Sequence, residues 1–274
     1  MKQLLLLAAG ALFYTSVAHA APQSSTVQAA GGPIRVTAIF HASTQIEYMG
    51  SVIDIDPVSA GRYTKKADII LVTHTHPDHF DPAAIDKVRA PYARLVAPIP
   101  VIQPYQQLRR PLALYPMKNG SILNFKMRSS KGAPIRIRIE AVPAYNLVRG
   151  PKAGQKFHPK GQFNGYVLTL GGKRIYFAGD TEATPEMMKL KNIDAAFLPM
   201  NLPYTMTPQE AALAARAFRP RIVFPYHFRF PFNKANTRPQ QFQNALRGTR
   251  IQVRMLDWYP APSVARAMAA MGKH

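Results

Sequence analysis

The sequence contains no cysteine, and acidic residues are scarce, with 14 Asp and Glu against 35 Lys and Arg in 274 residues. Without cysteine the chain has no disulfides, no thiolate nucleophile and no cysteine-ligated metal site. Any bound metal must be held by histidine, carboxylate or neutral oxygen ligands. The formal charge of +21 favours anionic partners but says nothing about the fold. With 47% hydrophobic residues, the chain can bury a substantial core.

Long hydrophobic runs are also missing beyond the first twenty residues. Residues 4–17 are almost entirely apolar, and Ala18-His19-Ala20 then fits the small-x-small cleavage pattern of a signal peptide. The run is shorter than the roughly 20 residues of a membrane span, so an uncleaved N-terminal anchor is only the alternative. The mature protein is expected to be exported, periplasmic or secreted, with no transmembrane segment. We predict a signal peptide over 1–20, a disordered segment over 21–32 and a single domain over 33–274.

Acidic residues are absent from three long stretches, 87–139, 141–179 and 211–256. The resulting positive field attracts anions, which are either a small substrate or an anionic cell envelope. Lys160, in the middle stretch, is predicted to bind substrate. Nucleic acid is an unlikely partner, because no helix-turn-helix, RNA-recognition or zinc-finger signature is present. The oligomeric state is not encoded in these patterns.

Strand and helix signals alternate along the chain, without a glycine-rich loop after a strand, which argues against a nucleotide-binding fold. A hairpin is predicted around Gly171-Gly172, and helices begin at Asp81-Pro82, Thr184-Pro185 and the capping box Thr207-Pro208-Gln209-Glu210. The first of these helices is expected to end near Arg89. Apolar and alternating runs predict strands at Ile34–Phe40, Val52–Ile55, Asp68–Thr73, Ile135–Ile139, Asp194–Pro199 and Arg221–Phe224.

The most specific segment is His74-Thr75-His76-Pro77-Asp78-His79, directly after a predicted buried strand. Imidazole and carboxylate together are ligands for divalent transition metals. In an extended loop His74 and His76 project to the same side and can bind one ion, while a turn at Pro77 lets Asp78 and His79 face a second. A chance match to this pattern has a probability of about 2 in 10,000 at the chain's own composition. A metal site is therefore the better interpretation.

Together with four other stretches, this motif resembles the metallo-β-lactamase fold hydrolases, and within them the branch of the ascorbate-phosphate lactonases and N-acyl phosphatidylethanolamine phospholipase D. The resemblance covers about Ile34 to Tyr259. It implies an α/β (α+β) fold, a four-layer αββα sandwich with metals at one edge. It also implies that Asp180 bridges two ions and that His227 binds the second. The other stretches are Phe40-His41-Ala42-Ser43, Asp54-Ile55-Asp56-Pro57, Tyr176-Phe177-Ala178-Gly179-Asp180-Thr181 and Phe224-Pro225-Tyr226-His227.

One departure from the family concerns the first metal, for which a third histidine is expected where this chain has Asn146. Three interpretations stay open. Asn146 ligates through its amide oxygen, His158 folds in as a ligand or acid/base group, or the position is left to water. We favour His158. His41 and Asp56 are expected near the metals, as ligands or as hydrogen-bond partners that orient the ligands.

These residues predict an exported metal-dependent hydrolase that uses a hydroxide held by two divalent ions on an anionic ester, lactone or phosphodiester. Zinc is expected, with manganese or iron as alternatives. A non-catalytic metal- or anion-binding envelope protein and an exported nuclease of the same fold are the rival functions. The catalytic residues are predicted to be Asp78 and His158, and the metal ligands His74, His76, Asp78, His79, Asp180 and His227.

Overall fold

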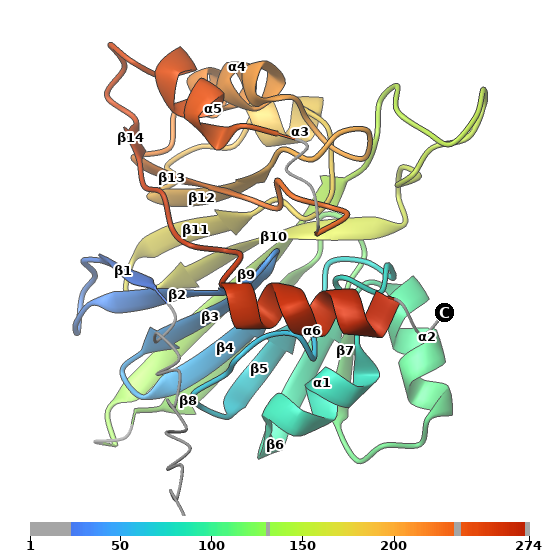
Figure 1. Cartoon of the computed structure of the whole chain (residues 1–274). Coiled ribbons are helices and arrows are strands. Elements are labelled where there is room, and N and C mark those ends of the chain that lie inside the picture. Colours follow the sequence, from blue (N-terminus) through green and yellow to red (C-terminus); the bar gives the residue numbers. More distant parts are fainter. Residues whose placement is uncertain (1–22, 130–131, 233–236, 272–274) are drawn as a thin grey trace, which may run out of the picture.

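Two seven-stranded mixed sheets form the body of the molecule in the computed structural model, which describes residues 23–129, 132–232 and 237–271 (Figure 1). In the first sheet the strands lie in chain order. They are β1 (Ser24–Val27), β2 (Ile34–Phe40), β3 (Ser43–Tyr48), β4 (Ser51–Ile55), β5 (Ala67–Leu71), β6 (Arg89–Ala97) and β7 (Ala113–Pro116).

The second sheet repeats the plan of the first. Its strands, again in chain order, are β8 (Ile122–Arg128), β9 (Pro134–Ala144), β10 (Phe163–Leu170), β11 (Lys173–Phe177), β12 (Ala195–Pro199), β13 (Ile222–Tyr226) and β14 (Gln252–Val253). In each sheet the first four strands pair antiparallel and the last four pair parallel. Strands β4 and β11 therefore hold equivalent places, each at the start of a parallel half.

The sheets pack face to face around a continuous apolar core that includes Ile46, Ile55, Leu168, Phe177 and Phe197. Helices cover both outer faces. On the first sheet these are α1 (Pro82–Val88), α2 (Ile99–Gln107) and α6 (Ala261–Met271), and on the second α3 (Pro185–Met188), α4 (Pro208–Phe218) and α5 (Pro239–Ala245). The predicted four-layer αββα sandwich is confirmed.

Local sequence signals explain several elements. The Gly171-Gly172 turn, with φ of 51° and 76°, joins β10 to β11 as predicted, because glycine adopts positive φ at little cost. Thr207 and Glu210 form the predicted capping box of α4. The predicted buried strand ends at Leu71 rather than Thr73, and α1 ends at Val88, one residue before the expected Arg89.

The N-terminal prediction needs one correction. Disorder over 21–32 is wrong for Ser24–Val27, which form β1 and pair with the residues Ile34 to Thr37 of β2. The predicted signal peptide lies outside the described residues. Among the described residues, no helix combines the length and the apolar character needed to cross a membrane.

Candidate metal centre

The histidines and carboxylates singled out from the sequence gather at one edge, where the strands of both sheets end. His41 follows β2, Asp56 follows β4, and the motif from His74 to His79 follows β5. From the second sheet, Asp180 comes shortly after β11 and His227 directly after β13. Parallel strands bring their carboxyl ends to a common edge, which is why residues so far apart in the sequence meet there.

Left-handed backbone conformations turn several of these residues across the edge. His41, Asp56 and His227 each follow a strand directly and have φ of 57°, 47° and 47°. Such conformations cost on the order of 1–3 kcal/mol for a residue other than glycine and persist where the surroundings enforce them. Before Asp180 the same turn is made by Gly179 at φ 65°, where a Cβ atom would lie 3.0 Å from the Cβ of Thr73.

Two clusters of ligand-type atoms result. The first cluster consists of His74, His76, His158 and Asp180, and one ligand atom from each lies within 4.8 Å of all the others. Asp180 Oδ2 is 3.8 Å from Nε2 of His74 and 3.5 Å from Nε2 of His158. The ring of His76 completes this cluster, with its Nδ1 3.2 Å from Nε2 of His158.

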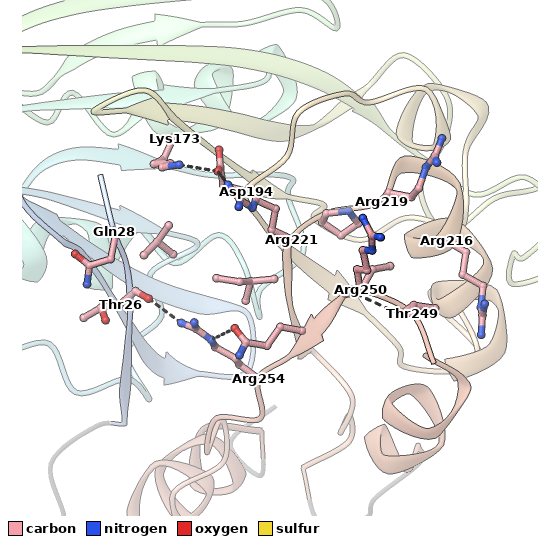
Figure 2. Close-up of a pocket in the computed structure, with 15 residues that line it drawn as sticks. Thr26, Gln28, Lys173, Asp194, Arg216, Arg219, Arg221, Thr249, Arg250 and Arg254 are labelled. Atoms are coloured by element: carbon pink, nitrogen blue, oxygen red, sulfur yellow. Dashed lines mark hydrogen bonds and ion pairs between the residues drawn. The ribbon is translucent and has the colours of Figure 1, made fainter. Parts of the chain in front are cut away.

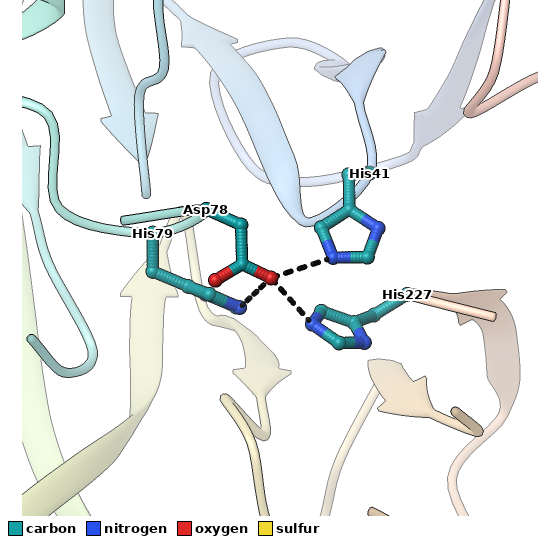
Figure 3. A group of neighbouring side chains, drawn as sticks. All are labelled: His41, Asp78, His79 and His227. Atoms are coloured by element: carbon teal, nitrogen blue, oxygen red, sulfur yellow. Dashed lines mark hydrogen bonds and ion pairs between the residues drawn. The ribbon is translucent and has the colours of Figure 1, made fainter. Parts of the chain in front are cut away.

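The second cluster consists of His41, Asp78, His79 and His227 (Figure 3). Asp78 lies at its centre, with Oδ2 3.1 Å from Nε2 of His41, 3.6 Å from Nε2 of His227 and 3.8 Å from Nε2 of His79. The three imidazoles are fully buried, whereas 17% of the Asp78 side chain is exposed. Asp78 is therefore the member of this cluster that solvent reaches.

Asp180 belongs to both clusters through its two carboxylate oxygens. Oδ2 faces the first cluster, as described above, while Oδ1 lies 3.4 Å from Nε2 of His79 and 3.2 Å from Nε2 of His227. A carboxylate in this position can present one oxygen to each of two cations.

The donor atoms fit metal ions. Buried polar atoms normally have a hydrogen-bond partner, and leaving one without a partner costs about 1–3 kcal/mol. Both clusters nevertheless contain buried atoms without a hydrogen bond. Neutral imidazole nitrogen and carboxylate oxygen are the donors that divalent transition metals prefer. The buried atoms without a hydrogen-bond partner are Nε2 of His74, Nε2 of His79, Oδ1 of Asp180 and both ring nitrogens of His227.

Electrostatics point the same way. Burial lowers the pKa of His41 to about 3, with a further contribution from His227, and lowers that of His158 to about 4. Burial also acts to lower the pKa of His79, but the nearby carboxylates of Asp180, Asp78 and Asp56 outweigh it and raise this pKa to about 10. Positive charge nearby thus stabilises the buried carboxylates, and bound cations can supply it.

Asp56 holds two of the histidines in the tautomer that a ligand needs. Its Oδ2 accepts hydrogen bonds from Nδ1 of His79 at 2.8 Å and from the hydroxyl of Thr73 at 2.8 Å. The Thr73 hydroxyl donates its only proton to Asp56. It must therefore accept a hydrogen bond from Nδ1 of His74, 2.9 Å away. In their neutral form both histidines therefore keep their proton on Nδ1, so Nε2 can present its lone pair toward the clusters.

His158 is held in the same way by Asn146. The amide oxygen of Asn146 accepts from Nδ1 of His158 at 2.7 Å and from its backbone N–H at 2.9 Å. The amide nitrogen donates to the Tyr204 carbonyl and to Glu182, which fixes the orientation of the amide. Asn146 thus has no atom left for a metal, and the structure brings His158 into the first cluster. Neither ring nitrogen of His158 faces solvent, which favours ligation over an acid/base role.

His41 differs from the other histidines. The hydroxyl oxygen of Tyr259 accepts hydrogen bonds from the backbone N–H groups of Phe228 and Arg229, at 2.9 and 3.0 Å. Both of its lone pairs are therefore used, so it donates its proton to Nδ1 of His41, 2.8 Å away. His41 then carries its own proton on Nε2 and donates it to Asp78. This tautomer orients Asp78 and leaves Nε2 unavailable to a cation.

The predicted substrate-binding residue, Lys160, has other partners. Its ammonium lies 3.5 Å from Glu186 Oε1 and 4.9 Å from the centre of the Tyr145 ring, and its side chain is largely exposed. Sequence reasoning also missed three residues of the site: Thr73, Glu182 and Tyr259. The first two adjoin recognised stretches and could have been found there. Tyr259 contacts a residue 218 positions away, which no local pattern signals.

Comparisons with known proteins agree with this geometry. A family model for the β-lactamase superfamily domain matches residues 19–228. The chain is 30% identical to a UPF0173 metal-dependent hydrolase of Ligilactobacillus salivarius, over 71% of this chain and 85% of that protein. It is 31% identical to one of Thermococcus kodakarensis, over 71% and 84%.

A solved structure from Parabacteroides distasonis, described as a metal-dependent hydrolase, is 38% identical with a TM-score of 0.72 and covers 86% of this chain and 99% of that one. Fold and relatives together define a metal-dependent hydrolase. The chain belongs to the metallo-β-lactamase superfamily. Its branch within the superfamily remains a prediction from the sequence.

Proposed function

We propose that this hydrolase works with two divalent cations, zinc in the first instance, and cleaves an anionic ester, lactone or phosphodiester. The observation that supports it is the position of Asp180, whose two oxygens face two separate clusters. In this proposal the first cation is held by His74, His76 and His158, the second by Asp78, His79 and His227, and Asp180 serves both. Two such ions act as Lewis acids and bring the pKa of a bound water toward neutrality.

The chain's own residues can then orient a water molecule. Asp78 is ionised, since the histidines around it lower its pKa well below the usual value despite burial. His41 fixes its Oδ2 by donating from Nε2, so the carboxylate can orient an attacking water by accepting a hydrogen bond from it. His41 thus acts through Asp78, to which it hydrogen-bonds. Asp56 acts through its hydrogen bonds to His79 and Thr73.

Metal analysis of the purified protein tests the proposal. The parent is expected to hold two equivalents of metal and to hydrolyse at least one substrate among esters, lactones and phosphodiesters. Asp180→Ala should lose metal from both clusters and lose activity. Asp86→Ala removes a carboxylate that pairs with Arg89 and Arg110, away from the clusters, and should keep both equivalents. A single equivalent in the parent, or two in Asp180→Ala, would contradict the two-cation assignment.

Export is part of the proposed function and rests on the sequence of residues 1–20. Cleavage is expected after Ala20, which would leave Ala21 as the first residue of the mature protein. Mass spectrometry of protein recovered from the cell envelope or medium checks this. An intact Met1 on exported protein would contradict cleavage, and accumulation in the cytoplasm alone would contradict export.

A second candidate function, binding of an anionic polymer, is favoured by a basic groove of about 1000 Å³. Figure 2 shows the side chains of Arg219, Arg221, Arg250 and Arg254 around it. One carboxylate, Asp194, lines the groove, and it is already shared by Lys173 at 3.1 Å and Arg221 at 3.8 Å. The groove therefore keeps a large excess of positive charge.

Retention on a heparin column tests this second function. Arg219→Glu combined with Arg250→Glu should elute at clearly lower salt than a control with the same change in net charge. Lys126→Glu combined with Arg136→Glu is such a control, because both positions are exposed and lie outside the groove. Equal elution of the two double variants would show that only the overall charge matters.

A further inference from the structure

An apolar pocket of about 420 Å³ opens beside the second cluster, with Asp78 in its wall. Another part of the wall is aromatic, formed by Phe40 at the end of β2 and by Phe230 and Phe232 beyond β13. The rings pack on one another, with centroids 4.9 Å apart for Phe40 and Phe232 and 5.2 Å apart for Phe230 and Phe232. The volume lies within the range of small-ligand sites, about 300–1,000 Å³.

This aromatic wall is continuous with the metal centre. The ring of His41 lies 5.1 Å from that of Phe232 and 6.1 Å from that of Phe230. The same imidazole donates to Asp78. A group seated on the phenylalanines would therefore hold the atoms attached to it next to Asp78.

The other two charged side chains around the pocket already have partners. The carboxylate of Asp81 accepts hydrogen bonds from the backbone N–H groups of Ser59 and Ala84, at 2.8 and 3.0 Å. Arg266 donates to the Ala60 carbonyl, at 2.7 Å from its Nη2. Away from Asp78, the pocket therefore offers a ligand mainly apolar contacts.

On the basis of the proposed function, we propose that this pocket receives an apolar acyl or aryl group of the substrate and so places the bond to be cleaved at Asp78. The enzyme would then prefer a substrate with two unlike parts. One is an ester or phosphoryl group at the metal centre, and the other is a short alkyl chain or a single aromatic ring in the pocket. Lining by phenylalanine, Val58 and alanines of α6 suits such a group.

Helix α6 offers a matched pair of variants. Ala270 is exposed and lines the pocket, so Ala270→Trp fills the space without disturbing the core. Ala269 is exposed on the same helix and does not line the pocket, so Ala269→Trp is the control. Ala270→Leu, a smaller filler, gives a second variant should tryptophan lower the thermal stability.

The experiment measures the affinity of the zinc-loaded protein for alkylphosphonates from methyl to hexyl by calorimetry. The parent and Ala269→Trp should bind about fourfold more tightly for each added methylene, until the pocket is full. Ala270→Trp should keep the affinity for methylphosphonate and lose most of this dependence on chain length, and Ala270→Leu should lose part of it. A flat chain-length series in the parent, or an equal slope in Ala270→Trp, would overturn the proposal.

A second series of ligands, the alkanols, tests the pocket independently of the proposed function. The alkanols from butanol to octanol carry no group for a cation, so their binding reports on the pocket alone. Chain-length dependence for alkanols with no binding of methylphosphonate would retain the pocket and refute the metal-centre chemistry. Binding of methylphosphonate with no chain-length dependence in either series would refute the pocket and retain the metal centre.

Discussion

Hydrogen bonds behind the ligands decide which atoms of the site are free to bind. His74, His79 and His158 each commit Nδ1 to an acceptor, and His41 commits Nε2 to Asp78. Four imidazoles of similar burial thus carry two different tautomers. Mutating a residue that hydrogen-bonds to a metal ligand commonly weakens metal affinity 10- to 100-fold. Substitutions at such residues should therefore lower the metal content even though these residues do not contact the metal.

His158 and Asn146 give the sharpest prediction of this kind. His158→Ala should abolish binding of the first cation, because it removes a donor atom from that cluster. Asn146→Ala should weaken the same site by about 10- to 100-fold without abolishing it, because His158 loses only the acceptor of its Nδ1 proton. Titration with zinc against a competing chelator measures both. Complete loss in Asn146→Ala together with normal binding in His158→Ala would make Asn146 the ligand.

A second prediction at this scale concerns Asp54, which is fully buried on β4. Its Oδ1 accepts from Gln45 at 2.9 Å, while Oδ2 has no hydrogen-bond partner. Burial raises its pKa from 3.8 to about 8. The folded protein therefore holds a proton that the unfolded chain releases near pH 4, so this group's contribution to stability falls as pH rises from about 4 to about 8.

Asp54→Asn should remove this pH dependence, because the amide cannot ionise. Relative to the parent, the variant should gain stability between pH 4 and 8, by an amount that approaches about 6 kcal/mol at most and is constant above pH 8. Urea unfolding at a series of pH values measures the difference. Glu47→Gln on the neighbouring strand, whose carboxylate forms an exposed pair with Lys65, is the control and should leave the pH profile nearly unchanged. A parallel offset at every pH in Asp54→Asn would contradict the raised pKa.

At the scale of elements, the two sheets use their equivalent strands in the same way. Strand β4 is followed by Asp56 and β11 by Asp180, so each sheet places one aspartate just beyond the first strand of its parallel half. Asp56 supports His79 directly and His74 through the Thr73 hydroxyl, while Asp180 faces both clusters directly. One arrangement of strands therefore supplies a supporting carboxylate from one sheet and a shared one from the other.

Elements with strong local signals were predictable, and the others were not. The strand Ile34–Phe40, the Gly-Gly hairpin and the capping box of α4 carry their information in adjacent residues. Helix α2 has Pro104 in its interior, and β1 is a four-residue edge strand, so neither shows a typical pattern. The positive φ of His41, Asp56 and His227 has no sequence signal, because it is imposed by packing.

The N-terminal strand provides the prediction for this scale. β1 pairs with four residues of β2, and Arg254 donates to Ser25 Oγ and to the carbonyl of Thr26, at 2.8 and 2.7 Å. A protein that begins at Gly32 should have a lower melting temperature and aggregate more readily than one that begins at Ala21, since the edge of β2 becomes unpaired. Calorimetry and light scattering measure this. Equal melting temperatures would show that β1 is dispensable.

At the scale of the whole molecule, positive charge and metal ligands occupy opposite ends of the second sheet. Lys173 begins β11, while Asp194 and Arg221 immediately precede β12 and β13, so the basic groove lies where these strands begin. Asp180 and His227 lie beyond the other ends of β11 and β13. Five residues of strand span about 17 Å, roughly twice the Debye length of about 8 Å at physiological salt. The groove should therefore contribute little to attracting a substrate at the metal centre.

The last prediction follows from this separation. Arg219→Glu combined with Arg250→Glu should change the affinity for methylphosphonate less than about twofold at 0.15 M salt, because screening isolates the groove from the site. The same variant should lose affinity at 0.01 M salt, where the Debye length grows to about 30 Å. Arg229 lies two residues after His227, over the Tyr259 ring at 5.9 Å, and Arg229→Gln should weaken binding severalfold at both salt concentrations. A large loss of methylphosphonate affinity in the groove variant at 0.15 M salt would contradict this prediction. It would mean that the groove steers anions to the metal centre and that the two sites do not act separately.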